Sequence, residues 1–201
     1  MSAYPLSYGQ SPPEQRNRLT VFFRLLTIIP HAIVAMFYLI AAYVVVIIAW
    51  FAILVTGKYP RGMYDFVAGF LRFYTRFQGY CYLVVDEFPP FDGAEHPEYP
   101  VRLAIGPPQD KYNRLTVFLR GLLAIPVFVL IYVFGIWLEV VAIVIWLVAV
   151  VVGRTSPGLT EALHFPMAYN ARAGGYLLLL TDKYPPVSDT ETLPHLSQPV
   201  A

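Results

Sequence analysis

The chain has 201 residues and a formal net charge of +1; 57% of its residues are hydrophobic and only 13% are charged. This composition is too apolar for an ordinary soluble domain. The near-neutral charge gives no indication of a nucleic-acid partner, and the single cysteine, Cys81, excludes an intramolecular disulfide. We therefore expect an integral membrane protein.

The chain repeats itself at an offset of 96 residues. Asn17–Arg24 returns as Asn113–Arg120, and Gly57 aligns with Gly153. A period this long indicates a duplicated domain and not a short solenoid repeat. We place copy one at 1–91, a polar linker at 92–98, copy two at 99–187, and a disordered tail rich in Ser, Thr and Pro at 188–201.

Each copy opens with a short extended segment. In Tyr99–Ile105, Val, Leu and Ile alternate with Arg and Ala, which is typical of a half-buried strand. Tyr4–Tyr8 is a weaker counterpart in copy one. We expect a strand at both places.

A long apolar block follows in each copy, at 19–56 and 115–152. Apolar runs beyond about 18 residues are typical of membrane helices. Each block can be divided in two ways. It is either a short interfacial helix followed by one long span, or a hairpin of two short spans that turns near 38–43 in copy one and 134–139 in copy two.

The charge distribution favours the hairpin. In a hairpin every Lys and Arg falls on one side of the membrane, as the positive-inside rule requires, whereas single spans divide them between the two sides. Glu139 would then lie near water at the turn and not in mid-membrane. Against the hairpin, the first turn region contains no Gly or Pro. We predict four membrane helices with both termini in the cytoplasm, and two long spans as the alternative.

The residues after each block predict an amphipathic helix. Between 63 and 77, aromatic residues recur on one face and Arg72 and Arg76 lie on the other. Such a helix either lies in the membrane interface or packs on the protein's own domain. In copy two, Pro166 replaces Phe70 and predicts a break or kink.

A short β-prone run closes each copy, at 80–85 and 176–181, and we predict a strand at both. The predicted fold is therefore an integral membrane α-helical fold with small β elements, of the α+β class. Each copy reads as strand, apolar helical hairpin, amphipathic interfacial helix and strand. The four strands could form one small sheet.

Several motifs resemble a bacterial membrane-protein family known as domain of unknown function 4389. They are the Asn17-Arg18-Leu19 start, the Ile29-Pro30-His31 step, the stretch 49–62 and the stretch 86–91. Copy two departs from the pattern, with Val127 in place of the histidine. The resemblance covers two tandem copies and implies the bacterial plasma (inner) membrane, in which the predicted helices would make the protein multi-pass. It implies no activity.

The sequence contains no phosphate-binding loop, dinucleotide fingerprint, nucleophile elbow or zinc-ligand spacing. We therefore expect a non-enzymatic protein without catalytic residues, bound metal or cofactor.

Basic residues near the block ends are candidates for binding lipid phosphates, because cations at headgroup level attract anionic lipids. The alternative is that they set the topology and pair locally with Asp65, Asp86, Glu161 and Asp182. The candidates are Arg18, Arg24, Lys58, Arg61, Arg72, Arg76, Arg114, Arg120, Arg154 and Arg172.

Four residues are candidates for a site between the repeats. Glu139 replaces Tyr43 and His164 replaces Ala68 in copy two, while His31 has no counterpart there. An intramembrane carboxylate suggests function, although Glu139 could also be a wet turn residue or a salt-bridge partner for another subunit. We expect His31 to bond to backbone or water beside Pro30.

These features predict an accessory or scaffold subunit of a membrane assembly. Its partners would be anionic phospholipids at a basic cytoplasmic rim, and other membrane-protein subunits or further copies of the chain. The alternative is a small transporter, channel or lipid-handling protein with a site at the interface of the two repeats.

Overall fold

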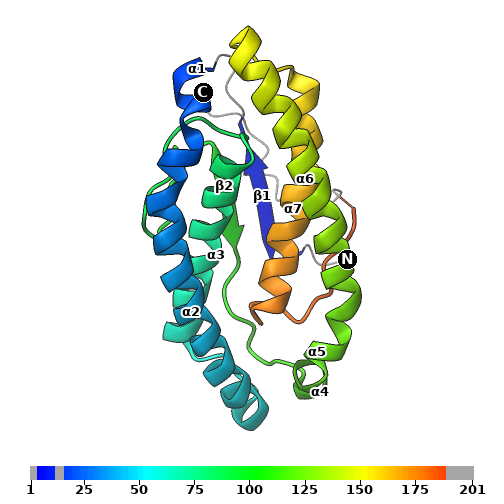
Figure 1. The fold of residues 1–201 in the computed structure, drawn as a ribbon. Coiled ribbons are helices and arrows are strands. Elements are labelled where there is room, and N and C mark those ends of the chain that lie inside the picture. Colours follow the sequence, from blue (N-terminus) through cyan, green and yellow to red (C-terminus); the bar gives the residue numbers. More distant parts are fainter. Residues whose placement is uncertain (1–3, 12–15, 189–201) are drawn as a thin grey trace.

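The computed structural model describes residues 4–11 and 16–188. The predicted tail at 188–201 lies outside the described residues beyond residue 188. The fold is mostly helical with one small sheet (Figure 1). Its elements are β1 (Leu6–Gln10), α1 (Arg18–Phe22), α2 (Arg24–Thr56), α3 (Arg61–Cys81), β2 (Val101–Ile105), α4 (Arg114–Phe118), α5 (Arg120–Leu123), α6 (Ile125–Val152) and α7 (Pro157–Leu177).

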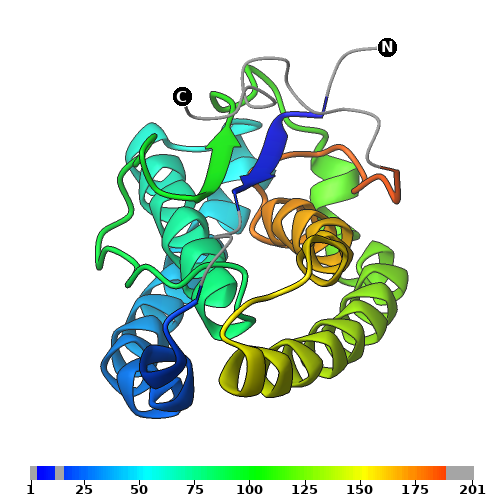
Figure 2. The same ribbon diagram turned by 90° about the horizontal axis from the view of Figure 1, so that it is seen from above.

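The elements form layers (Figure 2). The sheet lies on one side, α3 and α7 lie in the centre, and the two longest helices, α2 and α6, lie on the other side. α2 packs on α3 and α6 packs on α7. Each long helix therefore has protein along one side only.

The same local signals begin and end the helices of both copies. The Asn17 and Asn113 side chains accept hydrogen bonds from the first free backbone amides of α1 and α4, as good N-caps do. Gly57 and Gly153 end α2 and α6 with φ of 74° and 78°, a left-handed conformation that glycine adopts readily.

The predicted hairpins are wrong, because one long helix runs through each predicted turn region. α2 continues unbroken through the first predicted turn, and Gly135 stays helical within α6. Only Ala124 separates α6 from α5. An uninterrupted helix satisfies its backbone hydrogen bonds internally, and the apolar run offers no polar turn chemistry to replace them.

The predicted closing strands are also wrong. The β-prone runs instead carry the ends of α3 and α7 into a tight turn, in which Leu83 and Leu179 adopt φ of 61° and 63°. The amides of Val84 and Leu180 donate to carbonyls five residues back, the 6→1 bond of a Schellman motif. Burial of these leucines and valines in the core overrides their strand propensity.

The predicted amphipathic helix at 63–77 is part of α3, and its aromatic face packs inside the protein and not on a membrane surface. On α3 the residues Val67, Phe70 and Phe73 are buried in the protein, so the alternative of packing on its own domain holds. Pro166 lies inside α7, which is not broken there.

The opening strands are confirmed, and they join the two copies. β1 and β2 pair antiparallel, from Leu6 opposite Ile105 to Gln10 opposite Val101. β1 packs on α7 of copy two, and β2 packs on α3 of copy one. Likewise α1 contacts α6, and α4 contacts α2. Each copy therefore completes the other, and the two form one body.

Two equivalent glycines allow the strands to approach the helices. A Cβ at Gly79 would lie 2.8 Å from Val101 Cγ2, and a Cβ at Gly175 would overlap Leu6 Cδ2. We expect Gly175→Leu to lower the free energy of unfolding by about 1–3 kcal/mol, because added methylenes overpack a filled core. Thermal unfolding in mild detergent, followed by circular dichroism, measures this change.

Gly135→Leu is the matched control, since nothing lies within 4 Å of a Cβ at Gly135. This variant should unfold at the wild-type temperature or slightly above it, because leucine favours helix over glycine. Equal destabilisation by the two variants would contradict the strand exchange.

Candidate functional site

The most conspicuous feature of the molecule is the uncovered apolar side of α2 and α6. The helical segments Arg24–Thr56 and Arg120–Val152 are each long and apolar enough to cross a membrane. Only 22% and 17% of their most apolar stretches are buried. A core helix of a soluble protein would be mostly buried, whereas large exposed apolar surfaces of this kind mark sites of contact with a membrane or a partner.

Each of the two helices touches the protein through a narrow stripe. On α2 the stripe includes Ala42, Ala49 and Ile53, and on α6 it includes Leu138 and Ile145. We call the opposite sides the outer faces. They include Ile29, Ile33, Ile40, Ile47, Phe51 and Val55 on α2, and Val129, Val133, Ile136, Val140, Leu147 and Val151 on α6.

Exposed arginines lie at the ends of the long helices. Arg18 Nη2 donates to the carbonyl of Val152 at 3.0 Å, at the end of α6. The Arg114 guanidinium lies beside Gly57 at the end of α2. Cations favour helix C-termini, where carbonyls lack partners and the dipole is negative. Each long helix thus ends against an arginine of the other copy. Lys58, Arg61 and Arg154 are exposed at the same ends.

Four other lipid-phosphate candidates are buried. Arg24, Arg76, Arg120 and Arg172 have relative exposures of 2–6%. Their partners belong to the protein, so the alternative of local pairing describes them.

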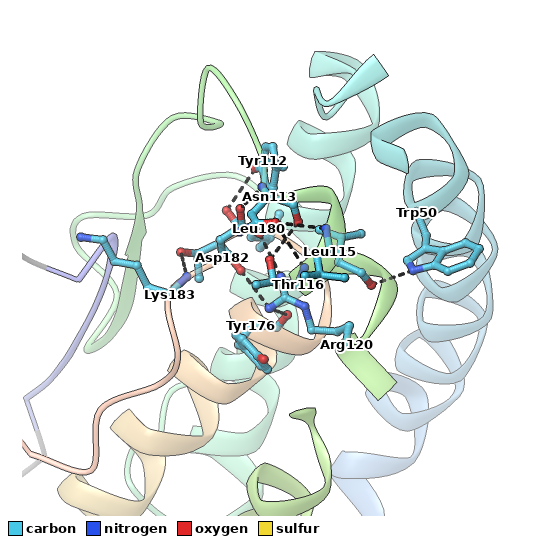
Figure 3. A network of polar contacts seen from close by, with 12 residues as sticks. Trp50, Tyr112, Asn113, Leu115, Thr116, Arg120, Tyr176, Leu180, Asp182 and Lys183 are labelled. Carbon is cyan, nitrogen blue, oxygen red and sulfur yellow. Dashed lines mark hydrogen bonds and ion pairs between the residues drawn. The ribbon is translucent and has the colours of Figure 1, made fainter. Parts of the chain in front are cut away.

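Arg120 holds the central polar cluster of copy two (Figure 3). Its Nη2 donates to Asp182 Oδ1 at 3.0 Å, and its Nη1 donates to the carbonyls of Tyr176 and Thr181. The guanidinium also lies over the Tyr176 ring at 3.9 Å. Burial lowers the pKa of this guanidinium, and Tyr176 and Asp182 oppose that shift.

The same cluster joins the copies. Asp182 Oδ2 accepts a hydrogen bond from the backbone amide of Asn113 at 2.7 Å, just before α4. From α2, Trp50 Nε1 donates to the carbonyl of Val117 at 2.9 Å (Figure 3). The ion pair therefore positions the start of α4, and the Trp50 bond joins α4 to α2 of the other copy.

Copy one has the equivalent cluster with one more charge. Arg24 Nη2 and Arg16 Nη1 each donate to Asp86 Oδ1 at 2.7 Å. Arg16 Nη2 also donates to the carbonyl of Leu83. Tyr112 stands at the equivalent position in copy two, so the repeat gave no signal for Arg16. Arg24 and Asp86 recur as Arg120 and Asp182, with a separation of 62 residues in both copies. This recurrence could have indicated from the sequence that each arginine pairs with its aspartate.

The remaining buried arginines hold the segments that follow the clusters. Arg76 donates to the carbonyls of Asp92 and Ala94, and Arg172 donates to those of Pro186 and Ser188. Arg72 is half-buried and pairs with Glu95 at 2.7 Å.

The four repeat-interface candidates contact different neighbours. Tyr43 is 56% exposed, and Glu139 is also exposed. Glu139 lies near Tyr82 of copy one, whose pKa burial raises to about 12, with smaller effects from Tyr74 and Glu139. His164 lies against the Tyr8 ring, with ring centroids 5.5 Å apart.

His31 is fully buried, and its expected bond to backbone is confirmed. Its Nε2 lies 2.7 Å from the carbonyl oxygen of Pro89, so this nitrogen must carry the proton and donate it. The imidazole stacks on Phe91 with centroids 3.9 Å apart and meets Phe88 edge-on at 4.3 Å. His31 thus fastens the end of copy one to α2.

Comparison with protein families gives one match, to the family described as Domain of unknown function (DUF4389), at residues 18–92 and 114–188. The chain belongs to this family. Each DUF4389 copy begins at the first turn of α1 or α4 and includes the pair Arg24–Asp86 or Arg120–Asp182, whereas Arg16, β1 and β2 lie outside both matched ranges. Neither the curated proteins nor the solved structures give a match.

The burial of the ion pairs predicts their importance for stability. Asp182→Asn should lower the free energy of unfolding by about 3 kcal/mol, because it leaves the Arg120 guanidinium buried without its counter-charge. Urea unfolding in mild detergent measures the loss.

Glu95→Gln is the control, since the carboxylate of its ion pair with Arg72 is 65% exposed. Its cost should stay below about 1 kcal/mol. If Asp182→Asn were as mild as this control, the buried pair would not be a structural determinant.

Proposed function

We propose that this protein is a non-enzymatic membrane protein that serves as an accessory or scaffold subunit, with the outer faces of α2 and α6 in lipid. The observation that carries the proposal is the uncovered apolar side of both helices. Apolar surface left in water costs about 25 cal/mol per Å². Contact with acyl chains removes this cost over the length of both helices.

The exposed basic residues support contact with anionic lipid. Lys58 and Arg61 lie beyond the end of α2, and Arg18 and Arg154 lie at the end of α6. A basic residue close to an anionic membrane surface contributes about 1 kcal/mol. Together with the positive-inside rule, this supports the cytoplasmic side of a bacterial plasma membrane.

The buried arginines form ion pairs within the protein, which supports a scaffold role over a transporter role. Arg24 and Arg120 are engaged in holding each copy together. Tyr43 and Glu139 are exposed on their helices, so neither side chain lies in an enclosed site between the repeats. We therefore propose that the protein binds other membrane-protein subunits or a second copy of itself.

Retained lipid tests this proposal. Native mass spectrometry of the protein released from mild detergent should show bound phosphatidylglycerol in preference to phosphatidylcholine. In the triple variant Lys58→Gln, Arg61→Gln, Arg154→Gln the preference should fall by at least tenfold, because three cations of about 1 kcal/mol each are lost. Arg102→Gln on β2, in the layer away from the outer faces, should keep the wild-type preference.

Native gel electrophoresis of mildly solubilised source membranes tests the scaffold role. We expect the protein to migrate as part of an assembly larger than the 22.7 kDa chain. A lipid-free monomer in both measurements would contradict the proposal.

A further inference from the structure

We propose that α2 and α6 lie in the plane of the membrane, sunk into one leaflet, and do not cross it. This inference rests on the proposed lipid contact of the outer faces and specifies its geometry. It makes the protein monotopic, with a single lipid leaflet covering both outer faces.

The first argument is length. α2 has 33 residues, which correspond to about 50 Å of helix. The hydrocarbon core of a bilayer is only about 30 Å thick. Exposed apolar side chains continue from Leu25 to Val55, over nearly the whole helix. A helix along the membrane normal would push part of this surface into water on one or both sides, whereas a helix in the plane has no such limit.

The second argument is the layer beside the helix. Tyr38 lies near the middle of α2, and its hydroxyl is 3.1 Å from the position of a Cβ on Gly69 of α3. The carbonyl of Gly93, in the polar linker, is 3.4 Å from the same point. The linker is therefore level with the centre of α2.

That linker and the adjoining part of α3 are charged. Asp92 and Glu95 have side-chain exposures of 58% and 65%, and they pair with Arg76 and Arg72. If α2 crossed the membrane, these groups would lie near the bilayer centre, at a cost of about 2.5–3.5 kcal/mol for each charged residue. With α2 in the plane, the linker does not reach the bilayer centre, because only the outer face of α2 enters the leaflet.

The sheet leads to the same orientation. Within the described residues it has two strands, so each strand has an edge that the sheet itself does not pair. Open sheet edges do not occur in contact with hydrocarbon, because their backbone groups would lack partners. The sheet lies on the side of the molecule opposite α2 and α6 (Figure 2). The in-plane orientation places it in water.

The third argument is the position of the basic residues. α2 and α6 run in opposite directions, so their basic C-terminal ends lie at opposite ends of the molecule (Figure 1). Crossing helices would put one basic end on each side of the membrane. Helices in one leaflet put both on the same side, which restores the charge bias that favoured hairpins.

Glu139 is accommodated by the same geometry. It is exposed in the middle of α6, where a crossing helix would place it at the bilayer centre. An interfacial helix is buried only about 5–10 Å below the headgroups along its whole length, so this carboxylate can reach them.

Spin labels along one outer face test the orientation. Ile29, Ile40 and Phe51 are exposed on α2 and are spaced by 11 residues, close to three turns, so they point the same way. Each is replaced by a labelled cysteine in a Cys81→Ser background, in vesicles of phosphatidylglycerol and phosphatidylcholine. Power saturation with oxygen and a water-soluble nickel complex gives the depth of each label. Ile33, Val44 and Val55 form a second set with the same spacing, for use if one label disturbs folding.

We expect the three labels to lie at one shallow depth, and a label at Glu95 to be accessible to the nickel complex. A label at Ile40 deeper than both others by about 16 Å, the rise of 11 helical residues, would overturn the in-plane orientation but leave lipid contact intact. If all three labels were fully accessible to the nickel complex, none would lie in the membrane, and the proposed lipid contact itself would be overturned.

Discussion

The structure depends on one constraint: α2 and α6 are packed against protein along a narrow stripe and carry apolar side chains on the opposite side. Exposing such a surface to water costs free energy, and this cost is the basis for the proposal that lipid covers it. Other features are consistent with that environment. The sheet lies on the side away from the outer faces, the polar linker lies beside α3, and cations cluster at the helix ends.

Two kinds of interaction hold the body that carries these faces. Within each copy, a buried arginine and a half-buried aspartate fasten the start of the copy to its end, 62 residues later. Between the copies, the strands are exchanged, so that β1 covers α7 and β2 covers α3. The duplication is therefore one folded unit, in which neither copy has a complete packing surface without the other.

Local signals in the sequence predicted much of this fold. The repeat, the strands predicted at 4–8 and 99–105, which the structure has at 6–10 and 101–105, and the family were all recognisable from residues. The predicted hairpins are absent, because a charge distribution does not determine where a helix ends, and the apolar runs carry no polar turn residues at the predicted turns. The ends of α3 and α7 depend on leucines in a left-handed conformation, which local propensity does not predict. Arg24 and Arg120 resembled surface cations, because their burial arises only from tertiary packing.

Polarised infrared spectroscopy in aligned bilayers tests the central claim most directly. α2, α3, α6 and α7 all run more along the long axis of the molecule than across it, with α6 inclined to the others (Figure 1), so the amide I dichroism of the whole protein reports the mean tilt of the helices. With α2 and α6 in one leaflet, the amide I transition moment should lie in the membrane plane. A transition moment along the membrane normal would show that the helices cross the bilayer, and would contradict the monotopic arrangement.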